Sequence, residues 1–161
     1  MKPAQPAPRS RSLEMAAVLA RCLVGAVFVY MGCVKALHPV EFLKMVRQYE
    51  VVHDPFLLNS IAAALPWFEV VCGALLLAGI AVRGSALILI ALLVPFSWMV
   101  LHRAVALQAS IPFCAIRFDC GCGGGEVPVC RKLLENVFLV LLCGWLLAGR
   151  GRNFCVRYRL I

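Results

Sequence analysis

The sequence predicts an all-α integral membrane protein, a bundle of four transmembrane helices with a short interfacial helix after the first span. Of its 161 residues, 63% are hydrophobic and 15% are charged, and the mean hydropathy is +0.90. Soluble domains are nearer half apolar and a quarter charged. The apolar residues gather in four long runs, and a helix of about 20 residues is enough to cross a bilayer. Composition therefore predicts the membrane class, and the runs predict the number of spans.

The first span follows a basic, proline-rich start, residues 1–14, which we expect to be a disordered tail. The apolar run over 15–37 has no small-residue cleavage site, so it is predicted to remain as a span instead of being removed as a signal peptide. Pro39 suits the first turn of the next helix, in which Phe42 and Val46 recur at helical spacing between charged residues. This pattern is typical of an amphipathic helix lying in the membrane interface.

The rest of the chain completes a single membrane domain over 15–149. It is divided into spans over 60–82, 85–101 and 128–148, a cysteine-bearing loop over 102–127, and a basic cytoplasmic tail over 150–161. Asn59 and Ser60 can cap the second span, because their side-chain oxygens accept from free N–H groups at a helix N-terminus. Arg83-Gly84 is expected to make a short turn into the third span, and Pro128 to begin the fourth helix.

The basic residues predict the orientation in the membrane. Nine Lys and Arg residues fall on the side of the two termini and seven on the other side. Because cytoplasmic loops are enriched in Lys and Arg, both termini are predicted to be cytoplasmic, in the inner membrane of a bacterium. The net charge of +8 is therefore not read as nucleic-acid binding. The cysteine loop is predicted to lie outside, where disulfides persist.

The cysteine loop is the strongest functional signal. Its segment DCGCGGGEVPVC, residues 119–130, holds three cysteines and four glycines, and Cys114 lies just upstream. A disulfide between Cys120 and Cys122 would close a small ring, and strained, exposed bridges tend to exchange. Cys130 is predicted in the first turn of the fourth helix, where the helix dipole and flanking basic residues favour its thiolate. Cys114 is a candidate resting partner of Cys130.

Two other interpretations of the same cysteines stay open. The four thiols could form two static bridges that tie down an exposed loop. They could instead bind zinc or an iron–sulfur cluster, although the Cys-x-Cys spacing is tighter than the common ligand frameworks.

A second candidate site lies within the spans. Glu69 is about nine residues into the second span, so it lies roughly 14 Å deep in a hydrocarbon core of about 30 Å. An ionisable group at that depth is costly unless it is neutral or paired, and Lys35 is the candidate partner. Glu69 could exchange protons with a bound quinone or with thiols, or it could be a neutral acid that fixes helix packing. Tyr30 and Trp67 are candidates to line the same outer pocket, although such aromatics also form the ordinary interfacial belt.

Three stretches carry a resemblance to a known group. They are YMGCVKALHPVEFLKMVRQYEVV at 30–52, LPWFEVVCGALLLAGIAVRGSAL at 65–87 and DCGCGGGEVPVCRKLLEN at 119–136. Together they resemble the MauE/DoxX group of redox-associated, four-helix membrane proteins, and the Cys-Gly-Cys segment is the most specific of them. The chain departs from the group at Gly123, often an aromatic, and at Glu135-Asn136, where the group has Arg-Asn. Cys114 and Cys130 are not part of the group's pattern.

The resemblance implies a role in disulfide formation or maturation of a periplasmic quinoprotein dehydrogenase subunit, beside a thioredoxin-like partner. For DoxX-like members it implies a quinone-linked oxidoreductase component. We therefore hypothesise a membrane thiol–disulfide redox protein that acts on an extracytoplasmic protein, with a role in methylamine dehydrogenase maturation. In this hypothesis Cys120 and Cys122 exchange, and Cys130 with Cys114 forms a second pair. The candidate cofactor is a quinone near Glu69, Lys35, Tyr30 and Trp67.

The competing hypotheses are a non-catalytic structural subunit whose disulfides only stiffen the loop, and a metal-handling membrane protein. The expected partners are the lipid bilayer and a periplasmic thioredoxin-like or substrate protein, with a homo-oligomer as a further candidate.

Overall fold

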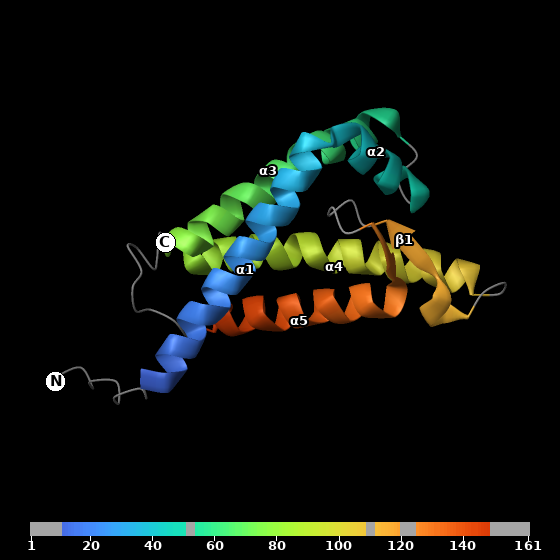
Figure 1. Ribbon diagram of the computed structural model, residues 1–161. Coiled ribbons are helices and arrows are strands. Elements are labelled where there is room, and N and C mark those ends of the chain that lie inside the picture. Colours follow the sequence, from blue (N-terminus) through green and yellow to red (C-terminus); the bar gives the residue numbers. More distant parts are fainter. Residues whose placement is uncertain (1–10, 51–53, 109–111, 120–124, 149–161) are drawn as a thin grey trace, which may run out of the picture.

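The computed structural model describes residues 11–50, 54–108, 112–119 and 125–148. In chain order its elements are the helices α1 (Arg11–Leu37), α2 (Pro39–Gln48), α3 (Pro55–Ala78) and α4 (Val82–Leu107), the 3-10 turn η1 (Phe113–Ala115), the strands β1 (Arg117–Asp119) and β2 (Glu126–Pro128), and the helix α5 (Val129–Leu147). The pair of α1 and α3 runs diagonally across the pair of α4 and α5 (Figure 1). We call the end of the bundle that holds α2, η1 and the strands the loop end. The end that holds the connection from α3 to α4 is the turn end.

Three helices are long and apolar enough to cross a membrane. These candidate spans cover Glu14–Leu37, Pro55–Ala78 and Val82–Leu107. A helix also forms over the predicted fourth span, but α5 carries Arg131, Lys132 and Glu135 in its first two turns and is not among the three found in the described residues. The structure therefore supports a multi-pass membrane protein, and the crossing of α5 stays a prediction.

Glycines allow α1 and α3 to lie against each other. A Cβ atom added at Gly73 would lie 2.8 Å from the carbonyl oxygen of Gly25, and one at Gly32 would lie 2.7 Å from that of Pro66. No side chain fits at such distances. Small residues at contacts of this kind are how membrane helices approach closely, because lipid supplies no hydrophobic force between them.

Both ends of α3 differ from the sequence prediction. The helix begins at Pro55, because Asp54 caps it: its Oδ1 accepts from the N–H groups of Phe56 (2.7 Å) and Leu57 (3.2 Å). The prediction that Asn59 or Ser60 caps this helix is therefore wrong. The helix ends at Gly79, whose φ of 71° suits a glycine C-cap, and the N–H of Ile80 donates to the carbonyl of Leu75 at 2.9 Å. The turn thus lies at 79–81, before Arg83-Gly84, which belong to α4.

The short helix α2 forms where it was predicted, with Pro39 in its first turn. Its apolar face does not project outward. Phe42, Met45 and Val46 are buried in a cluster at the loop end with Leu58, Val100 and Val129. The amphipathic pattern is explained by this packing against α3, α4 and α5, and an interfacial position stays a prediction.

The loop end also contains structure that the sequence analysis missed. The predicted loop over 102–127 starts too early, because α4 continues to Leu107. Arg103, inside this extension, donates to Glu50 beyond α2 at 2.8 Å. The strands β1 and β2 then pair antiparallel, with Phe118 opposite Val127 and Asp119 opposite Glu126. Three-residue strands between turn residues give too short a pattern for period-two alternation to reveal them.

Candidate functional site

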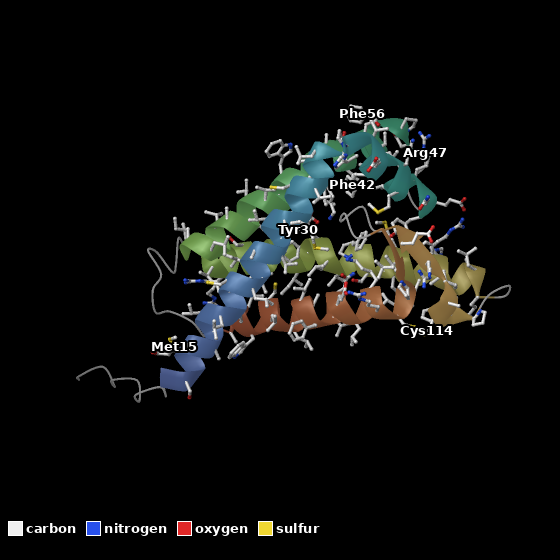
Figure 2. The ribbon with its side chains drawn as sticks, viewed as in Figure 1. Met15, Tyr30, Phe42, Arg47, Phe56 and Cys114 are labelled. Carbon is white, nitrogen blue, oxygen red and sulfur yellow. A yellow bond between two sulfur atoms is a disulfide. The ribbon has the colours of Figure 1, made fainter. Side chains whose placement is uncertain are left out.

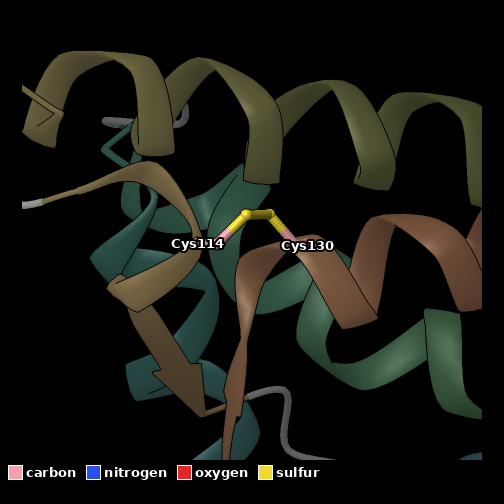
Figure 3. The surroundings of a disulfide bond; sticks show 2 residues. All are labelled: Cys114 and Cys130. Atoms are coloured by element: carbon pink, nitrogen blue, oxygen red, sulfur yellow. A yellow bond between two sulfur atoms is a disulfide. The ribbon is translucent and has the colours of Figure 1, made fainter.

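A disulfide joins Cys114 in η1 to Cys130 in the first turn of α5, with 5.2 Å between the Cα atoms (Figure 3). The N–H of Val129 donates to the carbonyl of Ile116 at 3.0 Å, which holds the two segments together beside the bridge. Cys114 and Met15 lie at opposite ends of the bundle (Figure 2). Cys130 therefore has the partner that the sequence analysis named as its candidate.

The other predicted exchanging pair, Cys120 and Cys122, lies outside the described residues. In the sequence these two cysteines fall between Asp119 and Glu126, which are paired across the two strands. Among the residues that the structure describes, there is no group of three or more His, Cys, Asp or Glu residues that could hold a metal ion. The disulfide engages two of the four thiols that the metal hypothesis would need.

Lys35 and Glu69 form a buried ion pair between α1 and α3. The Lys35 Nζ lies 2.6 and 2.8 Å from the two carboxylate oxygens of Glu69, and each side chain is 8% exposed. The same ammonium lies 5.4 Å from the centre of the Phe42 ring, within the range of a cation–π contact. The predicted partnership of these two residues is therefore present.

The ion pair lines a cavity of about 230 Å³ between the two core clusters. Helices α1 to α5 all contribute to its walls, and most of the lining side chains are aliphatic or aromatic. Two further polar side chains reach it from α5, Lys132 and Asn136, which are 6% and 1% exposed. The amide of Asn136 donates to Ser97 Oγ at 3.0 Å, and Ser97 in turn donates to the carbonyl of Leu93 at 2.7 Å. The cavity is therefore apolar with four polar groups on its wall.

Two of the predicted pocket residues lie elsewhere. Tyr30 is 61% exposed and Trp67 is 63% exposed, and neither lines the cavity. Their side chains lie on outward faces of α1 and α3, as expected of the aromatic belt. The structure thus brings together Lys35 and Glu69 but not the two aromatics.

Lys132 and Asn136 are the cavity residues that the sequence analysis did not select. The spacing of residues along α5 could have identified them. The buried positions of α5 recur every three or four residues, as the residues of one helix face do; they are Val129, Lys132, Asn136, Leu139, Cys143 and Leu146. Polar residues on an otherwise apolar helix face mark an interior polar site.

A row of aromatic rings connects the strands to the cavity. The ring of Tyr49 lies 5.7 Å from that of Phe118 in β1 and 5.8 Å from that of Phe96, and Phe96 lines the cavity. Both contacts are edge-to-face, a favourable arrangement for aromatic pairs. Strand β1, which precedes Cys120 in the sequence, is therefore packed through Tyr49 against the cavity wall.

Comparison with protein families matches residues 13–149 to the model for methylamine utilisation protein MauE. The chain belongs to the MauE family. The match covers all five helices of this MauE-family chain apart from the first two residues of α1. No curated protein and no solved structure matches the chain.

Proposed function

We propose that this MauE-family chain is a membrane thiol–disulfide redox protein that supports disulfide formation in an extracytoplasmic protein during methylamine utilisation. The observation that carries the proposal is the disulfide between Cys114 and Cys130. It joins the start of α5 to the segment that leads, through β1, to Cys120 and Cys122 in the sequence. The family match supports the setting in methylamine utilisation.

The proposed reaction is thiol–disulfide exchange. A dithiol of the substrate protein, or of a thioredoxin-like partner, attacks the Cys120–Cys122 disulfide and forms a mixed disulfide. The second substrate thiol resolves it, so the substrate gains a disulfide and Cys120 and Cys122 become thiols. These thiols reduce the Cys114–Cys130 bridge by the same chemistry. The thiols of Cys114 and Cys130 give up two electrons and two protons as their bridge forms again. A quinone held near Lys35 and Glu69 would supply the oxidant for this step.

The exchange is tested with single Cys120→Ser and Cys122→Ser variants and with Cys33→Ser as the matched control. Cys33 is an exposed thiol on α1, outside the site. Either loop variant is expected to abolish substrate oxidation, and one of them is expected to trap the mixed disulfide with its partner. Full oxidation of the substrate by both loop variants would overturn the proposal.

The disulfide also favours a second candidate function, a structural subunit that docks a partner. Because the bridge ties η1 to α5, it can act as a staple without exchanging. The reduction potential of the loop cysteines separates the two functions. Structural bridges in secreted proteins lie below about −300 mV, and exchanging ones are more oxidising.

The proposed location is the bacterial inner membrane, with both termini cytoplasmic and the cysteines outside. The start of α1 and the end of α5 lie at the same end of the bundle (Figure 1), which supports an even number of crossings. A membrane-impermeant maleimide applied to intact cells should label the loop cysteines only after mild reduction. Labelling of Cys155 instead would invert the orientation.

A further inference from the structure

Lys132 is a buried basic residue with no direct partner among the residues that the structure describes. Its residue is 6% exposed and lines the cavity. Among the residues that the structure describes, no acceptor takes a hydrogen bond from its ammonium, whereas its neighbour Arg131 donates to Glu135 at 2.9 Å. A charge removed from water is costly unless it is paired or hydrogen-bonded. Something other than the described side chains is therefore needed to satisfy it.

The two carboxylates near Lys132 are each bound to another cation. Its electrostatic neighbours are Glu135, Lys35 and Glu69. Both carboxylate oxygens of Glu69 are bound by Lys35, and Glu135 is partly exposed and bound by Arg131. The cavity wall thus carries one positive charge in excess of its negative charge. An anionic group in the cavity would balance this charge.

The rest of the cavity excludes a small hydrated anion. Its wall beyond the four polar residues is built of apolar side chains, among them Met31, Ile61, Leu65, Leu92, Phe96 and Met99. An ion such as chloride or phosphate would lose its hydration there and gain few donors. A molecule with an apolar body and a single charged head fits both the walls and Lys132.

We propose that the cavity binds an apolar molecule carrying one anionic oxygen, which accepts a hydrogen bond from the Lys132 ammonium. The amide nitrogen of Asn136, one helical turn further along α5, has a second N–H besides the one given to Ser97. Two sources have this chemistry: a fatty acid, and a quinol that has lost one hydroxyl proton. The inference stands apart from the cysteine chemistry, because no thiol is needed for binding.

The test compares dodecanoate with dodecanol on the protein in phosphatidylcholine nanodiscs, with the shift in the thermal unfolding midpoint as the readout. The two probes share a chain length and differ in charge. Dodecanoate is expected to bind at least about tenfold more tightly, the effect of a hydrogen bond between charged groups. The Lys132→Met variant should lose this preference and bind dodecanol as before, and Lys132→Arg should keep it. Lys44→Met, which removes an exposed charge outside the cavity, should leave the preference unchanged.

Equal binding of dodecanoate and dodecanol to the unaltered chain would overturn the inference. This comparison uses the unaltered chain alone, so it does not depend on whether any variant folds. An acid preference lost equally in Lys44→Met would also overturn it, since general surface attraction would then suffice. Mass spectrometry of lipids extracted from the purified protein separates the sources. If the extract of the unaltered protein holds more of a fatty acid or a quinone than the extract of Lys132→Met, the inference is supported and the ligand is identified. Equal amounts in the two extracts would overturn the inference. Full substrate oxidation by the Cys120→Ser and Cys122→Ser variants, in a protein that still prefers dodecanoate, would defeat the proposed function alone.

Discussion

The two ends of the bundle are held together in different ways. At the turn end, helices approach through glycine, and the core is an apolar cluster that includes Val24, Leu76 and Leu146. At the loop end, the elements are joined by a disulfide, a buried ion pair and a salt bridge between Arg103 in α4 and Glu50, which follows α2. The cavity lies where the two kinds of packing meet. The turn end thus depends on apolar packing, and the loop end adds specific chemical partners to an apolar cluster of its own.

This difference indicates what each end is for. Close apolar packing gives a fixed scaffold and offers a ligand nothing to bind. Buried polar groups are costly to maintain in a membrane and are usually kept for function. We therefore expect substitutions at the loop end to affect binding or exchange as well as stability, and those at the turn end to affect stability alone.

The largest effect is expected from removing one member of the buried ion pair. Glu69→Leu leaves the Lys35 ammonium without its carboxylate and should lower the free energy of unfolding by about 3–5 kcal/mol. The double variant Lys35→Met/Glu69→Leu should recover most of that loss, because neither charge remains. Denaturation by SDS in mixed micelles measures both. At the turn end Leu76→Met, which keeps volume and polarity, should cost less than about 1.5 kcal/mol. A double variant as unstable as the single one would contradict the pairing.

The disulfide is expected to give the next largest effect. Cys114 and Cys130 are separated by 16 residues, and closing a loop of that length contributes about 3 kcal/mol by restricting the unfolded chain. The double Cys114→Ser/Cys130→Ser variant should lose about this much stability in the same assay. Cys33→Ser, at an exposed position, should stay within about 0.5 kcal/mol of the unaltered chain. No difference between the two variants would show that the bridge does not support the fold.

The turn end is tested by filling the contact between α1 and α3. Gly73→Ala places a Cβ atom 2.8 Å from the Gly25 carbonyl oxygen, and such overpacking typically costs about 1–3 kcal/mol. Gly84→Ala is the matched control, since nothing lies within 4 Å of its added Cβ. That substitution should stabilise helix α4 by about 0.5–1 kcal/mol. Equal responses at the two glycines would show that backbone entropy, and not close approach, decides the effect.

The sequence predicted the apolar helices and the Lys35–Glu69 pairing, because hydrophobic runs and isolated charges inside them are local signals. It placed Arg83-Gly84 in the turn because basic residues usually flank spans. The structure instead uses Gly79, whose left-handed backbone conformation closes α3. Lys132 was read only as a neighbour of Cys130, since its burial depends on how α5 packs against the other helices. Contacts between elements distant in the sequence, such as Tyr49 with Phe118, have no local signature.

The smallest predicted effect distinguishes two caps at the start of α3. Asp54→Ala removes the acceptor of the Phe56 and Leu57 N–H groups and should cost about 1 kcal/mol, whereas Asp54→Asn should keep most of the stability. Ser60 lies inside the helix and donates to the carbonyl of Phe56 at 2.8 Å, so Ser60→Ala should change stability by less than about 0.5 kcal/mol. Unfolding in mixed micelles measures all three. If Ser60→Ala costs more than Asp54→Ala, α3 begins at Ser60 in the membrane. The residues before Ser60 would then not be helical, and Leu58 would no longer pack in the cluster that buries the apolar face of α2.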